Sequence, residues 1–203
     1  MFIDDLPLEL FLMSLIMVIA VYMNIDAYLN YKKNGIQDIK ESLKPGAYSL
    51  GIFGALVIIF ALYGEMLWPL PGSYNILFYD PFTLFGIIVI AVAVSIILKQ
   101  KLQYIGILAL FSGLISIFYG AYLYKDGFTS SPIAGLGLYI AFGLTGVFAF
   151  PVTLAYDTLS VNKKPSDFWK IIFLIFWIGL IMSAFIAAFI ALEAVPAHLL
   201  APP

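Results

Sequence analysis

The residues that could do chemistry stand at the ends of long apolar runs. Glu65 precedes Trp68 by about one helical turn, near the end of the second run. A helix dipole disfavours negative charge there, and tryptophan is typical of a membrane interface. The Glu65 carboxyl could therefore bind a proton or a cation, or accept a hydrogen bond from a polar solute. The alternative is structural, with the carboxyl reaching headgroup water or the hydroxyl of Ser73 or Tyr74.

The connector WPLPGSYNILFYDPF, residues 68–82, holds further candidates. Asp80 precedes Pro81, and an acidic residue followed by proline is typical of an N-cap and first helical position. Asp80 could thus be structural or functional. Glu193 ends the sixth run and would join Glu65 if their helices touch. The polar candidates for an outer mouth are Glu65, Ser73, Tyr74, Asn75, Asp80 and Glu193.

A second polar group lies near the opposite ends of the first and fifth runs. Its members are Asn24, Asp26 and Asp157. We interpret them mainly as members of interfacial salt bridges, because lysines are plentiful in the neighbouring connections. The lysines that could pair with these acids are Lys32, Lys33, Lys163 and Lys164.

Composition argues against several kinds of site. There is no cysteine, which excludes disulfides, thiolate metal sites and a cysteine nucleophile. A single histidine, His198, disfavours haem or histidine-rich metal sites. No arginine is present, so nucleic acid is a poor partner. The middles of the apolar runs hold no Lys, Asp, Glu or His, which disfavours ion-coupled transport. We therefore predict no catalytic residue, no cofactor and no metal.

The elements that position these residues are apolar helices in lipid. The 203-residue chain is 63% hydrophobic and only 11% charged, whereas about a quarter of the residues in soluble domains are charged. Six runs are long enough to cross a bilayer, and lipid-exposed backbone must be helical. We predict one all-α domain over residues 1–203, an integral membrane bundle of six transmembrane helices. The predicted spans are 6–29, 46–68, 80–98, 102–124, 132–157 and 167–192.

Lysine placement predicts the orientation of this bundle. Nine of the ten lysines fall in or beside the connections after the first, third and fifth spans, and only Lys125 lies on the other side. The positive-inside rule puts these connections in the cytoplasm and both termini outside the cell membrane. Seven of the twelve acidic residues, Glu9 among them, fall on the side that this orientation places outside the cell. Ile36, Ile39 and Leu43 predict either a short surface helix or a solvated loop before the second span.

Short patterns predict how the helices pack. YGEML (63–67) resembles YGAYL (119–123), and both end an outward-running span, so spans two–three and four–five could be duplicated hairpins. Ser112, Ser116 and Gly120 recur every fourth residue, as do the small residues at 179, 183 and 187. Such spacing favours close helix packing.

Two resemblances bear on the class of protein. The run WPLPGSYNILFYDPFTLFG (68–86) and the six spans resemble an archaeal multi-pass membrane family, domain of unknown function 981. This resemblance implies a fold and a membrane location but no activity. The topology and FYDPFTLFG (78–86) are also similar to the acid-gated urea and amide channels. The several outer histidines that this second resemblance implies are missing, which argues against acid gating by histidine.

These observations leave more than one function open. The first hypothesis is a small-solute channel or facilitator, since a pore for a neutral solute needs no buried charge. The alternative is a non-catalytic accessory subunit of a larger, perhaps respiratory, membrane complex, with the lipid bilayer and other chains or copies of itself as partners. A membrane-embedded enzyme, with Glu65 and Asp80 holding a divalent metal through oxygen ligands, is the least favoured.

Overall fold

The chain forms six long helices and, in the part described, no strands. The computed structural model describes residues 5–34, 39–129, 131–158 and 166–200. Its helices are α1 (Leu6–Asn34), α2 (Ile39–Leu67), α3 (Ser73–Ile97), α4 (Gln103–Asp126), α5 (Pro132–Thr158) and α6 (Asp167–Leu200). All six are long and apolar enough to cross a membrane, as the composition predicts.

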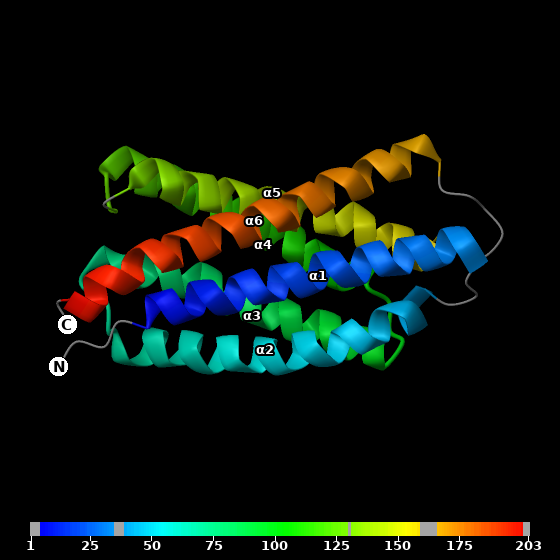
Figure 1. The fold of residues 1–203 in the computed structure, drawn as a ribbon, viewed down its shortest axis with the longest axis horizontal. Coiled ribbons are helices and arrows are strands. Elements are labelled where there is room, and N and C mark those ends of the chain that lie inside the picture. The colour runs from blue at the N-terminus through cyan, green and yellow to red at the C-terminus, as the bar shows by residue number, and fades with distance from the viewer. Residues whose placement is uncertain (1–4, 35–38, 130, 159–165, 201–203) are drawn as a thin grey trace.

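The helices make a closed ring in chain order. Each packs on its sequence neighbours, and α6 returns to pack on α1 (Figure 1). Because the connections are short, successive helices run in opposite directions, and α1 begins where α6 ends. We call this the acidic end, since it carries Glu9, Glu65, Asp80 and Glu193. The opposite end, with Lys40, Lys99, Lys101 and Lys170 among others, is the basic end.

Large apolar side chains cover the outside of the ring. On α6, for example, Leu174, Ile178 and Ile181 are each about half exposed. In water such a surface would aggregate, whereas lipid is its natural solvent. Small residues face inward instead, and Ser116 on α4 and Ser183 on α6 are fully buried. The predicted packing role of the regularly spaced small residues fits these positions.

The second span begins earlier than predicted. Helix α2 starts at Ile39, so Ile39 and Leu43 belong to its first turns and not to a surface helix or a loop. Leu43 is almost completely buried in the ring interior, which explains its apolar character. Pro45 is the seventh residue of α2, so it lies inside the helix and has no N–H to donate to the carbonyl of Glu41. Ile36 lies outside the described residues.

The N-cap prediction for Asp80 is wrong. Helix α3 begins at Ser73, with Gly72 at φ 56° as the N-cap, so Asp80 and Pro81 lie two turns inside it. Pro81 has no N–H and leaves the carbonyl of Leu77 without its intrahelical donor. The hydroxyl of Tyr139 on α5 donates to that carbonyl instead. A hydrogen bond from another helix therefore satisfies the carbonyl that the internal proline leaves without a donor.

The two YG segments make the same contact. A Cβ atom at Gly64 would overlap the ring of Tyr79, and one at Gly120 would lie 2.5 Å from the Cβ of Tyr139. In each hairpin a glycine near the end of one helix thus receives a tyrosine from the next helix. This shared packing fits the proposed duplication of α2–α3 and α4–α5.

Candidate functional site

Asn75 fixes the connector between α2 and α3. Its side chain is completely buried. Its Nδ2 donates to the carbonyl of Gly64 at 3.0 Å, and its Oδ1 accepts from the N–H of Leu70 at 3.2 Å. Both ends of the connector are tied to one amide, so Asn75 serves the structure of the mouth. Ser73 beside it is exposed.

Glu65 and Asp80 come together at the acidic end. The Glu65 side chain interacts with that of Asp80 on α3, and the hydroxyl of Tyr119 on α4 donates to Asp80. Three helices are thus joined by one polar cluster. Neither carboxyl is among the residues that line the cavities described below. Glu193 does not join this cluster, since it lies on the vestibule wall with Tyr74.

A vestibule of about 350 Å³ opens the ring at the acidic end. Tyr74 and Phe78 of α3 stack with ring centroids 6.1 Å apart on one wall, and Glu193 of α6 stands on another. Of the six predicted outer residues, only Tyr74 and Glu193 line this space. The vestibule is therefore aromatic on one side and acidic on the other.

Below the vestibule lies a neck of about 40 Å³. Glu9 of α1 lines it and is only 1% exposed. Ser116 of α4, also on its wall, lies ten residues before the end of that helix at Asp126. Glu9 lies in the first turn of α1, so it is a buried acid close to the acidic end of the bundle.

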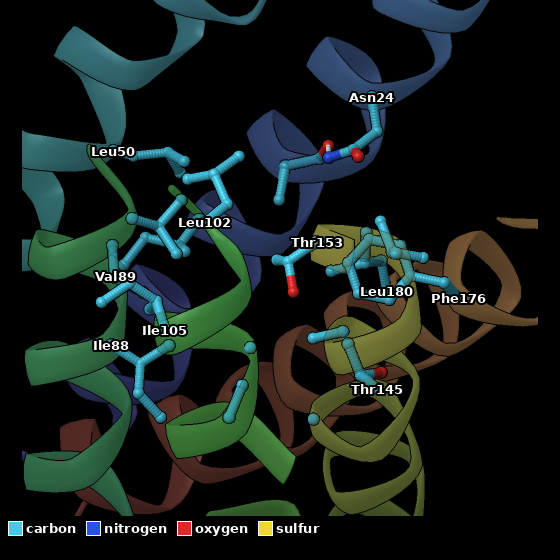
Figure 2. Close-up of a pocket in the computed structure, with 18 of the residues that line it drawn as sticks. Asn24, Leu50, Ile88, Val89, Leu102, Ile105, Thr145, Thr153, Phe176 and Leu180 are labelled. Carbon is cyan, nitrogen blue, oxygen red and sulfur yellow. Dashed lines mark hydrogen bonds between the residues drawn. The ribbon is translucent and has the colours of Figure 1, made fainter. Parts of the chain in front are cut away.

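A central chamber of about 140 Å³ fills the ring towards the basic end. All six helices contribute to its wall. Aliphatic side chains such as Leu50, Val89 and Ile105 face α5 and α6 across it, while Asn24, Thr145 and Thr153 supply polar atoms (Figure 2). The chamber is therefore apolar with a few hydrogen-bonding positions.

The three cavities follow one another along the axis of the ring, from the acidic end towards the basic end. Vestibule and neck share Leu10, Phe78 and Tyr139 among their walls. Neck and chamber share Phe85 and Phe142, whose rings meet edge to face at 5.2 Å between centroids. An aromatic pair thus separates the two inner spaces. The cavities form a discontinuous path from the acidic end past the middle of the bundle.

The hydroxyls on this path present acceptors to the cavities. Thr145 donates to the carbonyl of Ala141 and Thr153 to that of Phe150, both at 2.8 Å. Ser116 donates to the carbonyl of Tyr139 at 3.4 Å. Each hydroxyl has one hydrogen, so its oxygen keeps acceptor capacity, although the Thr145 oxygen also lies 3.5 Å from the hydroxyl of Ser183. A solute with N–H or O–H donors would match them.

Polar bonds close the chamber at the basic end. The hydroxyl of Tyr156 donates to Asn24, joining α5 to α1. Beyond it, Asp157 pairs with Lys40 of α2 at 3.0 Å and accepts from the N–H of Gln103 at 2.8 Å. These side chains are the inner end of the path.

The inner acids have other partners than the predicted ones. Asp157 is paired with Lys40, a lysine that the sequence interpretation did not assign to it. Asp26 accepts from the amide of Asn30 at 3.1 Å on the exposed side of α1. Lys163 and Lys164 lie outside the described residues.

The fold and this path define a six-helix protein of the multi-pass membrane class. The chain belongs to the family described as protein of unknown function (DUF981), whose model matches residues 1–201. The resemblance of residues 68–86 to this family is thereby confirmed. No curated protein and no solved structure matches the chain.

Proposed function

We propose that the protein is a channel or facilitator for small neutral solutes that carry N–H donors, such as ammonia, methylamine and short amides. The single observation behind the proposal is the succession of vestibule, neck and chamber through the closed ring. A bundle that only holds partners together has no need of aligned interior spaces, because membrane helices normally pack closely.

The lining favours neutral solutes. Moving a charge into a chamber with an apolar wall is costly, and so is burying several hydroxyls without partners. Ions and polyols would therefore be rejected at the chamber. A small amine or amide buries few polar groups, and Thr145 and Thr153 offer acceptors to its N–H groups. These positions would offset part of the desolvation cost.

The proposal includes an orientation in the cell membrane. The lysine-rich connections would face the cytoplasm, so the vestibule and both termini would face outwards. The solute would then enter at the acidic end, pass the neck and the Phe85–Phe142 pair, and leave past Tyr156 and Asn24. Passage would require movement at these two closures.

Solute flux into proteoliposomes tests the proposal. Stopped-flow light scattering would compare acetamide and glycerol entry in liposomes with and without the purified protein. We expect acetamide entry to rise severalfold above empty liposomes, with glycerol entry unchanged. Equal rates for acetamide with and without protein would refute the channel. Equal acceleration of glycerol would refute the proposed selectivity.

A further inference from the structure

We infer that the central chamber is a binding site for one neutral aromatic amine of about the size of benzene, such as aniline. The inference deepens the proposed function, on which its consequence for flux rests, because a molecule held in the chamber would occupy the path. Binding itself requires only the chamber. The basis is the chamber's size and apolar wall, its aromatic rings and one buried hydroxyl that has no hydrogen-bond partner among the described residues.

The size and wall of the chamber suit a single apolar ring. Its volume is about 140 Å³, and an apolar protein cavity of roughly 150 Å³ stays free of water and takes up benzene. Leu50, Val89 and Ile105 are typical of the aliphatic wall (Figure 2). None of the described residues that line the chamber is charged. The body of the ligand is therefore expected to be apolar and compact.

Aromatic side chains stand at both ends of the chamber. Phe85 and Phe142 meet edge to face on the side of the neck, with 5.2 Å between centroids. Tyr156 lines the chamber towards the basic end, where its bond to Asn24 holds the ring in place. Rings attract one another in edge-to-face and offset arrangements, beyond the effect of burial. An aromatic ligand is thus favoured over an aliphatic one of the same size.

The polar anchor of the site is Ser112 on α4. Its side chain lines the chamber and is only 6% exposed. Among the described residues, none forms a hydrogen bond with its hydroxyl, whereas Thr145 and Thr153 donate to backbone carbonyls. A buried hydroxyl without a partner is destabilising. A ligand with one polar group beside Ser112 would supply the missing partner.

The hydroxyls of the wall favour an N–H donor on the ligand. The oxygens of Ser112, Thr145 and Thr153 can all accept, but only Ser112 has a hydrogen left to give. The amino group of aniline is neutral at pH 7, because its lone pair is delocalised into the ring. Benzylamine is similar in size but charged at this pH, as alkylamines are. Because an apolar wall disfavours that charge, benzylamine should be excluded.

Equilibrium dialysis of the purified full-length protein in detergent tests the site, with radiolabelled aniline or toluene and with empty micelles as the background. We expect saturable binding of aniline that toluene displaces and benzylamine does not. Ser112→Ala should weaken aniline binding about fivefold, because one hydrogen bond is lost. It should leave toluene binding unchanged, because toluene carries a methyl group in place of the amino group.

Two substitutions on α5 test the location of the site. Ala149→Phe places a ring in the chamber and should abolish the binding of aniline and toluene. Leu144→Phe, on the outside of the ring, is the matched control and should bind both as the wild type does. Thermal unfolding shows whether each variant is folded. If Ala149→Phe is not, Ser112→Ala decides, since the loss of an unpartnered hydroxyl should not lower the melting temperature.

Several outcomes would overturn the inference. They are absence of saturable aniline binding to the wild type, equal aniline affinity in Ser112→Ala, displacement by benzylamine, and binding by a folded Ala149→Phe variant. Acetamide flux through liposomes made from the same wild-type preparation separates the two proposals. Flux without aniline binding overturns the aromatic site alone, and aniline binding without flux overturns the channel alone. Where both are found, saturating aniline should lower acetamide flux, and unaltered flux would contradict a site on the path.

Discussion

Single buried polar residues hold the ends of the path in place. Asn75 bonds both the last turn of α2 and the connector that follows it. Tyr156 bonds Asn24 across the basic end of the chamber. Neither side chain is charged, and each joins two segments of the chain through hydrogen bonds. Their substitution should therefore change stability or gating without changing the chemical character of the path.

Replacing Asn75 should loosen the acidic end. Asn75→Ala removes two buried hydrogen bonds, and each contributes about 1 kcal/mol, so the free energy of unfolding should fall by about 2 kcal/mol. Thermal unfolding in detergent, followed by circular dichroism, measures the loss. Ser73→Ala is the control, since that side chain is exposed. Equal melting temperatures for the two variants would contradict the role given to Asn75.

Replacing Tyr156 should ease the inner closure. Tyr156→Phe keeps the ring against Phe173, 5.4 Å away between centroids, and removes only the bond to Asn24. A bond of about 1 kcal/mol corresponds to roughly a fivefold change in the open population. We therefore expect acetamide flux to rise by about that factor. Tyr104→Phe, exposed on α4, should leave flux unchanged. A lower or unaltered flux in Tyr156→Phe would show that this bond is no gate.

At the scale of elements, α3 shows how one helix depends on another. Pro81 opens a gap in the backbone bonding of α3, and Tyr139 of α5 fills it. The same tyrosine packs on Gly120 of α4. Three helices therefore meet at one side chain, directly beside the neck.

A double-mutant cycle tests this dependence. Tyr139→Phe should cost about 1–3 kcal/mol of unfolding free energy, because the Leu77 carbonyl loses its partner. Adding Pro81→Ala restores an N–H that can reach that carbonyl, so the double variant should recover much of the loss. Thermal unfolding of the four proteins gives the coupling. Additive effects of the two substitutions would contradict the proposed compensation.

The sequence predicts the helices better than the site. Long apolar runs report the spans directly, because only helices satisfy their backbone in lipid. The meaning of Asp80–Pro81 is different, since the same pair can begin a helix or sit inside one. Only the distant Tyr139 hydroxyl decides between these outcomes. The burial of Glu9 likewise depends on how α1 packs against the other helices, and no local pattern in the sequence carries that information.

At the scale of the whole molecule, charge separates the two ends of the ring. The proposed orientation predicts which end faces the outside of the cell. Ser73 and Lys101 are exposed at opposite ends, and the chain has no cysteine of its own. A membrane-impermeant maleimide should label Ser73→Cys on intact cells, and label Lys101→Cys only after lysis. The reverse pattern would invert the proposed path.

The proposed path depends above all on the central chamber. It lies inside a ring of six helices whose outer surface suits lipid, and its wall draws on every helix. Solute flux through such a path should fall when a larger side chain fills the chamber, and it should stay the same when a side chain on the outer surface is enlarged. Two substitutions on α5 separate these effects. Ala149 lines the chamber, whereas Leu144 is 43% exposed on the outside of the ring.

The most direct test is therefore acetamide flux through proteoliposomes that carry Ala149→Phe or Leu144→Phe, at equal protein density. The first variant places a ring in a space of about 140 Å³, and the second places one against lipid. We expect Ala149→Phe to lower flux to the level of empty liposomes and Leu144→Phe to keep the wild-type rate. Wild-type flux through a folded Ala149→Phe variant would contradict a path through the chamber.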